Sequence, residues 1–236
     1  MAASAGPRRA GISAFVALLS LAACSGAFGE RVRERVHRTI ATGAAPVVRV
    51  ENVAGAVRID GWARPIVEAD ATKYGYDAQE LRSIAIAVNR EDDGVSIVTS
   101  YTRGVHGGGV RYRISVPAGA SLRIHNIAGS VDLAGVSGSV EVQTQAGTID
   151  ANVGRVAGDR SIDLSATTGA ITLAIASDSS ARVEAYSTVG DFSSDVPGVS
   201  QRRENIVGAR GSGTIGAGSA QIRLTTTTGA IVLRQR

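Results

Sequence analysis

A short pattern recurs along this chain, and it limits the possible folds more than any other feature. In the clearest copies, two apolar residues flank a polar one, a glycine follows five residues later, and a second alternating pair follows the glycine, as in Leu122-Arg-Ile124 to Gly129-Ser-Val131-Asp-Leu133; the copies at Val183 and Ile206 match this pattern less well. Copies begin at Val48, Leu122, Val140, Ile162, Val183, Ile206 and Ile222. From Gly129 onward their glycines lie 18, 22, 21, 23 and 16 residues apart. Steps of about 20 residues are typical of the stacked coils of a solenoid.

The alternation predicts two short strands in each copy, with the apolar residues on one face. The glycine between the strands can adopt the positive φ angle that a tight corner needs. Asparagine, serine or threonine stands two residues after the first strand in most copies, where its side chain can bond to the corner backbone. We therefore expect Leu164 and Ile171 to point into a shared core, and Asp163 and Thr172 to point outward.

The pattern stops between Gly55 and Gly129, but alternation continues. Segments that read as strands are 64–72, 82–90, 94–101 and 110–116. Asp92-Asp93-Gly94 predicts a hairpin turn, and Asp77-Ala-Gln-Glu80 resembles a capping box that opens one helical turn. Aromatic residues are only 4% of the chain, so Val, Ile, Leu and Ala must fill the core. The sequence thus predicts an all-β fold: a β-solenoid with a strand-and-hairpin insertion near the N-terminal end.

The N-terminus has the pattern of an export signal. Two arginines precede the uncharged residues 11–23, a run shorter than the about 20 residues that span a bilayer. The run ends in Leu21-Ala22-Ala23-Cys24, which resembles the lipobox of bacterial lipoproteins. Cys24 is also the single cysteine, so it cannot form an internal disulfide. Lipidation of Cys24 explains both facts; the alternative is ordinary cleavage nearby, for instance after Ala27.

These features divide the chain into three predicted parts. Residues 1–23 are a lipoprotein signal peptide, residues 24–35 a tether, and residues 36–236 one domain of β-strand repeats. A multiply acylated Cys24 would be a durable anchor in the lipid bilayer, since each buried methylene adds about 0.8 kcal/mol. Ser25 resembles an outer-membrane sorting signal, so we expect an exported lipoprotein anchored in the outer membrane of the cell envelope.

The domain resembles a known family. The residues that carry the resemblance are Val110 to Leu133, Val136-Ser-Gly-Ser-Val-Glu-Val142, Gly147-Thr-Ile149, and Ala71-Thr-Lys-Tyr-Gly75 with residues 77–81. Over residues 36–236 this pattern is similar to that of the bacterial putative-adhesin domain of β-strand repeats, a domain of unknown function. The resemblance implies a right-handed parallel β-solenoid, and it supplies no catalytic residue.

The sequence shows no catalytic or zinc-binding motif. His37, His106 and His125 lack the spacing of zinc ligands and are interpreted as solvated side chains. Gly135-Val-Ser-Gly-Ser139 lacks the last glycine of a nucleophile elbow and is interpreted as a corner. Glu91-Asp92-Asp93 is interpreted as a hairpin tip.

One outward column of the repeats is acidic. The residue between the first two apolar positions is, in successive copies, Arg49, Arg123, Glu141, Asp163, Glu184, Val207 and Arg223. If the copies stack in sequence order, Glu141, Asp163 and Glu184 lie one above another, about 4.8 Å apart per coil. Like charges that face each other across strands destabilise a sheet, so an arginine or a bound cation would have to offset the repulsion. The column is interpreted as solvated carboxylates screened by salt, and the alternative is a weak calcium site.

Charge gives no support to a nucleic-acid partner, and the lack of catalytic motifs favours a binding protein. The formal net charge of +4 falls by two when the leader arginines are removed, which gives no reason to propose nucleic acid as a partner. We expect a non-enzymatic, lipid-anchored envelope protein without a cofactor, whose solenoid presents a binding or adhesion surface to envelope polymers or other proteins. The alternative is a β-helix enzyme acting on envelope or extracellular polysaccharide, with two carboxylates about 5–10 Å apart in a deep cleft. The last copy is expected to end the stack, where Arg234 and Arg236 would guard its open edge.

Overall fold

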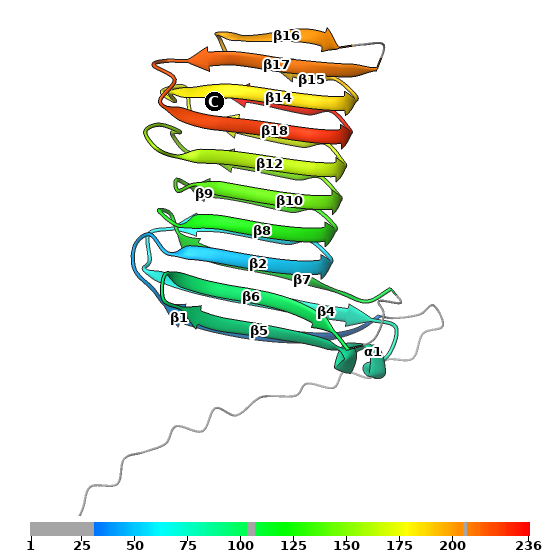
Figure 1. Ribbon diagram of the computed structural model, residues 1–236. Helices are drawn as coiled ribbons and strands as arrows, with labels where there is room; N and C mark the ends of the chain where they lie inside the picture. The colour runs from blue at the N-terminus through cyan, green and yellow to red at the C-terminus, as the bar shows by residue number, and fades with distance from the viewer. Residues whose placement is uncertain (1–30, 103–106, 205–206) are drawn as a thin grey trace, which may run out of the picture. The chain divides into compact units, whose positions relative to one another are not determined.

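Nearly all of the regular secondary structure in the described chain is β and is arranged in two sheets (Figure 1). The computed structural model describes residues 31–102, 107–204 and 207–236, and these contain one helix, α1 (Ala78–Ser83). In spatial order, sheet A contains β1 (Val32–Ala41), β4 (Ile66–Gly75), β7 (Gly109–Pro117), β3 (Val57–Trp62), β9 (Val131–Val136), β11 (Ile149–Val153), β13 (Ile171–Ile175), β19 (Ile231–Gln235) and β15 (Phe192–Ser194). In spatial order, sheet B contains β16 (Val199–Glu204), β17 (Gly208–Ile215), β14 (Ala181–Val189), β18 (Ala220–Thr228), β12 (Ser161–Thr168), β10 (Val140–Ala146), β8 (Ser121–Ala128), β2 (Val47–Ala54), β6 (Gly94–Tyr101) and β5 (Ile84–Glu91).

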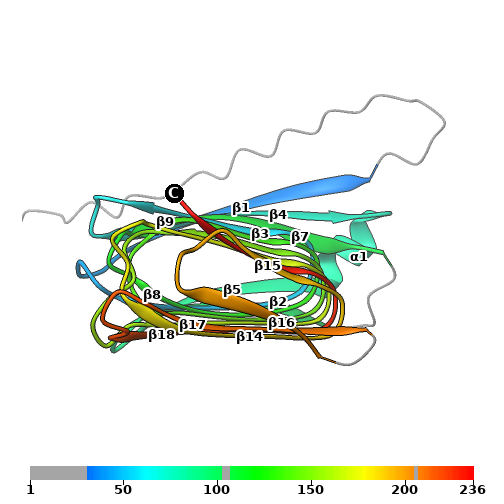
Figure 2. The same cartoon turned by 90° about the horizontal axis from the view of Figure 1, so that it is seen from above.

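Each coil contributes one strand to sheet B and the next strand to sheet A. Neighbouring coils pair in parallel and in register, for example Val142 with Leu164 in sheet B and Ala151 with Leu173 in sheet A. Seen along the stack, the coils form a flattened ring in which the two sheets face each other (Figure 2). The architecture is the parallel β-solenoid that the sequence predicts, while the right-handed sense of the coil stays a prediction.

The copies do not stack in sequence order. β18 pairs with β12 on one side and with β14 on the other, and β19 likewise lies between β13 and β15. The copy that comes last in the sequence therefore lies inside the stack, and the expectation that it ends the stack is wrong. Arg234 lies in β19 and Arg236 directly follows it; because β19 has neighbours on both sides, the two arginines do not guard the end. Without β18, backbone N–H and C=O groups of β12 and β14 would lack hydrogen-bond partners. β18 pairs with both strands and supplies these partners.

The first copy also lies inside the stack. The coil β2–β3 lies between β8–β9 and a further coil formed by β6 and β7, where the repeated pattern had stopped. β5 and β4 pair antiparallel with β6 and β7 and cover this end, with the predicted hairpin turn between β5 and β6. The predicted helical turn is α1, where the Asp77 side chain accepts a hydrogen bond from the Glu80 N–H at 2.7 Å.

Strand β1 corrects the predicted tether. β1 begins at Val32 and pairs antiparallel with β4 along its whole length. Residues 32–35, expected in the tether, therefore belong to sheet A, because β4 would otherwise leave its outer row of N–H and C=O groups unpaired. The predicted signal peptide and Cys24 lie outside the described residues.

A hairpin closes the opposite end of the stack. β17 pairs antiparallel with β14, and β16 pairs antiparallel with β17. The prediction that a copy of the repeat begins at Ile206 is therefore wrong. Arg210, which stands two residues after the first predicted strand of that copy, is exposed within β17. Gly211 lies against the Phe192 ring, where an added Cβ would be 2.3 Å from Cε1.

Glycines form one column at the corner between the two sheets. The members, all with positive φ, are Gly55, Gly129, Gly147, Gly169, Gly229 and Gly190. A Cβ on Gly147 would lie 2.1 Å from the carbonyl oxygen of Gly129, so the coils can approach this closely only with glycine here. Beside the column, Asn126 Nδ2 donates to the Gly129 carbonyl at 2.8 Å and Thr226 Oγ1 to the Gly169 carbonyl at 3.0 Å. These bonds confirm the predicted role of the polar corner residues.

The core lies between the sheets. Leu164 and Ile171 are fully buried, whereas Asp163 and Thr172 are only half-buried on the outward faces, as predicted. Aromatic side chains fill the core toward its two ends, with Tyr112 in β7 and Phe192 in β15. Burial raises the pKa of Tyr112 to about 12, and its hydroxyl shares a 2.6 Å hydrogen bond with Thr99.

Candidate binding surface

The outward face of sheet B carries a column of charged side chains across the stack. Strand pairing places these residues side by side in the order Arg49, Arg123, Glu141, Asp163, Arg223 and Glu184. Arg223 therefore lies between Asp163 and Glu184, and the predicted column of three neighbouring carboxylates is wrong. The insertion of β18 into the stack places a guanidinium group where the calcium hypothesis needs a carboxylate.

Arginines offset the repulsion between the two carboxylates that do lie side by side. Arg123 Nε is 3.8 Å from Glu141 Oε2, and Arg223 Nη1 is 3.9 Å from Asp163 Oδ2. Partial burial raises the pKa of Asp163, Arg223 opposes that rise, and Glu141 adds to it. A bound cation is therefore not needed to explain this column.

Arg49 continues the column and holds the tip of the β5–β6 hairpin. Its guanidinium lies 2.6 Å from Glu91 Oε2 and 2.9 Å from Asp93 Oδ2. The hydrogen bond from Arg49 keeps the pKa of Asp93 below its usual value. The acidic run at residues 91–93 thus has the structural role that the sequence analysis assigned to it.

A shallow depression of about 640 Å³ lies on the same face, over β14, β16, β17 and β18. Arg202, Arg210 and Arg223 line it together with the exposed ring of Tyr186 and the carboxylate of Glu184. Among the described residues that line it, Glu184 supplies the one carboxylate. Glycoside hydrolysis needs a pair of carboxyl groups.

Three aspartates line a smaller depression on the outward face of sheet A. Asp60, Asp132 and Asp150 surround about 220 Å³, which is below the range of about 300–1,000 Å³ typical of ligand pockets. Asp60 is held by Arg58 through two hydrogen bonds of 3.0 and 3.1 Å. This hydrogen bonding raises the pKa of Arg58. The arrangement is that of a surface ion pair at the edge of a shallow hollow.

A basic groove of about 410 Å³ lies beside it on sheet A. We give this name to the surface lined by Arg35, Ala56, Arg58, Asp70, Thr72, Arg111, Tyr112, Arg113 and Asp132. Its four arginines come from β1, β3 and β7, at positions that the strand alternation points outward. Throughout the described ranges of the chain, Arg35, Arg111 and Arg113 form no ion pair. The groove therefore carries positive charge that its own carboxylates do not neutralise.

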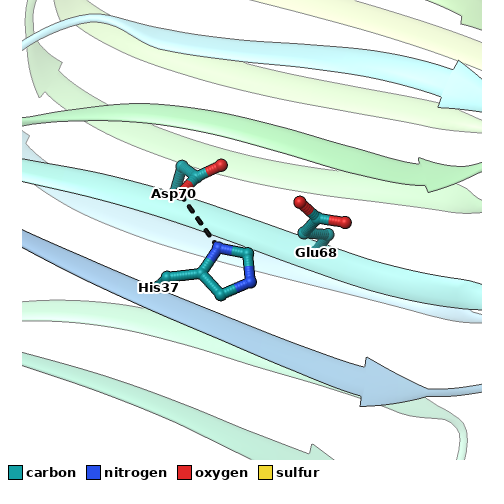
Figure 3. A group of neighbouring side chains, drawn as sticks. All are labelled: His37, Glu68 and Asp70. Carbon is teal, nitrogen blue, oxygen red and sulfur yellow. Dashed lines mark hydrogen bonds and ion pairs between the residues drawn. The ribbon is translucent and has the colours of Figure 1, made fainter. Parts of the chain in front are cut away.

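Asp70 of the basic groove is engaged by His37 on the neighbouring strand (Figure 3). His37 Nδ1 lies 2.9 Å from Asp70 Oδ1, and Glu68 lies close by on the same strand as Asp70. Ligand atoms of these three residues lie within 4.8 Å of one another, a spacing that could hold a metal ion. However, Arg113 is paired with Asp70 in register and Arg35 lies two residues from His37. These guanidinium groups oppose a further cation, so the cluster is better explained by the hydrogen bond between His37 and Asp70.

The structure separates the residues that sequence analysis singled out. Cys24 and His106 lie outside the described residues. His125 is exposed on sheet B, between Glu51 and Gln143 of the neighbouring strands. Ser137 Oγ donates to the Ala118 carbonyl at 2.9 Å, in keeping with its interpretation as a corner residue. The basic groove and the contact between His37 and Asp70 were missed, because only the pairing of β1 with β4 and of β4 with β7 assembles them.

Comparison with known proteins identifies the family. The sequence profile of the Toastrack DUF4097 family matches residues 113–234. The solved structure of a putative cell adhesion protein from Clostridium sporogenes ATCC 15579 is similar, with a TM-score of 0.64 and 11% identity over 87% of this chain and 100% of that chain. A putative adhesin from Bacteroides fragilis NCTC 9343 aligns over 86% of this chain and 97% of that chain, at 10% identity and a TM-score of 0.30. No curated protein matches the sequence.

Fold and surface together define the class: a parallel β-solenoid whose outward faces are polar. Within that class, the chain belongs to the Toastrack DUF4097 family, which confirms the resemblance to the domain of β-strand repeats with unknown function. The likeness to the clostridial structure shows a shared fold. Among the described residues, no helix is long and apolar enough to cross a membrane.

Proposed function

We propose that this chain is a non-enzymatic protein of the cell envelope, anchored in the outer membrane by an acylated Cys24, whose solenoid acts in adhesion. The exported and lipidated N-terminus is proposed from Leu21-Ala22-Ala23-Cys24 and the uncharged run before it. The clostridial structure of similar fold, which is named as a putative cell adhesion protein, supports the adhesion role.

One observation carries the proposal: charged and polar side chains form a continuous outward row across every strand of sheet B. A single outward row of sheet B runs from Asn89 in β5 to Ser200 in β16 through paired residues of every strand between them. Solenoids use such extended surfaces to bind long partners. Many weak contacts along a polymer or a neighbouring cell surface add up to firm attachment.

The experiment compares cells that carry the chain with cells that lack it. Retention of each strain on a surface coated with envelope material from neighbouring cells is measured under flow. Cells that carry the wild-type chain should be retained more strongly. A Cys24→Ala strain that exports the domain without an anchor should be retained no better than cells that lack the chain. Equal retention with and without the wild-type chain would overturn the adhesion role.

A further inference from the structure

We infer that the basic groove binds the anionic groups of an acidic polysaccharide. This inference rests on the proposed function and names the ligand class of one part of the adhesion surface. The groove lies on the outward face of sheet A, where β1, β4, β7, β3 and β9 lie side by side.

The first argument is the crowding of like charges. Arg111 and Arg113 lie two residues apart on β7 and point to the same face, and both are exposed. Arg113 is paired directly with Arg58 on the parallel strand β3. Like charges that face each other across neighbouring strands destabilise a sheet. An anion seated between these guanidinium groups removes that repulsion.

The second argument is that three arginines of the groove are not paired with the nearby carboxylates. Asp60 accepts two hydrogen bonds from Arg58, and Asp70 is bonded to His37. Arg35, Arg111 and Arg113 have no ion pair with any residue that the structure describes. Three guanidinium groups are therefore available to a ligand in one groove. Guanidinium binds carboxylate and sulfate groups through two parallel hydrogen bonds.

The third argument separates a polysaccharide from other polyanions. A membrane surface would require exposed apolar or aromatic side chains to insert, but Tyr112 is buried and Ala56 is the other apolar residue of the lining. A single-stranded nucleic acid is bound by basic residues combined with exposed aromatic rings, and the aromatic residue of this lining, Tyr112, is buried. Hydroxyl groups of a sugar can donate to the carboxylates of Asp70 and Asp132 and to Thr72, while its acidic groups meet the arginines.

The test measures binding of the full-length lipoprotein in detergent to polygalacturonate, with dextran sulfate and neutral dextran as comparison polymers. Wild-type protein should bind the carboxylated or the sulfated polymer and not dextran, and the stronger of the two identifies the anionic group. The double variant Arg111→Gln/Arg113→Gln should bind about tenfold more weakly, the size expected for the loss of two surface ion pairs. Binding should also weaken as salt is raised, because exposed charges are screened.

The matched control is Arg90→Gln/Arg234→Gln, which removes the same charge from exposed positions outside the groove. It should bind like the wild type. Equal losses in the two double variants would show only a long-range effect of net charge and would overturn the site. Failure to bind either acidic polymer, or preference for anionic lipid vesicles or DNA, would overturn the ligand class. In that case, cells that carry the chain can still be retained on envelope material. Failure of this inference is therefore distinguishable from failure of the adhesion proposal.

Discussion

At the level of single residues, the corner glycines leave no room for a side chain. Gly147 has a φ angle of 153°, and a Cβ there would lie 2.1 Å from the backbone oxygen of Gly129. Gly147→Ala combines backbone strain with a clash against backbone, so it should lower the free energy of unfolding by roughly 3 kcal/mol. Urea denaturation measures the change. Gly43→Ala is the control, because no atom lies within 4 Å of its added Cβ, and an equal effect of both variants would contradict the close approach of the coils.

The burial of Leu164 gives a second prediction. Leu164 is fully buried between the sheets, so Leu164→Asp places a carboxylate without a partner in the core. The free energy of unfolding should fall by roughly 4 kcal/mol or more. Thermal unfolding followed by circular dichroism tests this. A variant that melts like the wild type would show that residue 164 does not face the core.

The neighbouring Asp163 should behave differently, and in a way that depends on pH. Its pKa is raised in the folded state, so the stability that it contributes is present below its unfolded pKa and is lost as pH rises through the folded pKa. Asp163→Asn removes the ionisable carboxyl group, and with it the loss of stability as pH rises. The variant should therefore melt at the same or a higher temperature than the wild type at pH 7. A clear loss of stability at pH 7 would mean that the ion pair with Arg223 outweighs desolvation.

Residue-level features differ in how far the sequence predicts them. Inward and outward positions follow from alternation within a strand, so the environments of Leu164 and Asp163 were predictable. The basic groove was not, because Arg35, Arg58 and Arg111 come from three strands that the sequence does not mark as neighbours. The pattern of one strand carries no information about which strand lies beside it.

At the level of elements, the order of the coils is the main departure from expectation. One signal for it was present: residues 167–171 and 227–231 have the same sequence, Thr-Thr-Gly-Ala-Ile. These segments belong to β12–β13 and β18–β19, which are neighbours in the stack. Similar repeats pack well against each other, but similarity alone does not decide which pair is adjacent. Backbone pairing on both sides of β18 decides it.

Cross-linking can test this order. Asp163 and Arg223 are paired in adjacent parallel strands, about 4.8 Å apart, whereas Asp163 and Glu184 are separated by two such steps. In a Cys24→Ser background, Asp163→Cys/Arg223→Cys should form an intramolecular disulfide under mild oxidation, detected by gel mobility and thiol titration. Asp163→Cys/Glu184→Cys should remain reduced, because cysteines more than about 7 Å apart cannot be bridged. A disulfide in Asp163→Cys/Glu184→Cys and none in Asp163→Cys/Arg223→Cys would show instead that the coils stack in sequence order.

At the level of the whole molecule, the proposed attachment to the membrane depends on residues before the solenoid. Cys24→Ala removes the proposed site of acylation, so the protein should move from the membrane pellet to the soluble fraction or accumulate as an uncleaved precursor. Fractionation followed by immunoblotting measures this. A variant that is processed and still pellets like the wild type would contradict lipidation. Ser25→Ala keeps the thiol and serves as a control that should remain in the pellet.

The position of β18 and β19 has a consequence for how this protein can be made and trimmed. In most repeat proteins, each repeat contacts only its sequence neighbours, so a terminal repeat can be lost and a shorter array remains. Here β18 and β19, which follow β14 to β17 in the sequence, complete a coil in the interior. Until residues 220–235 have been synthesised, no strand lies between β12 and β14. Proteolysis or a premature stop before these residues therefore removes a coil from the interior of the stack, and the stack is complete only when they are present.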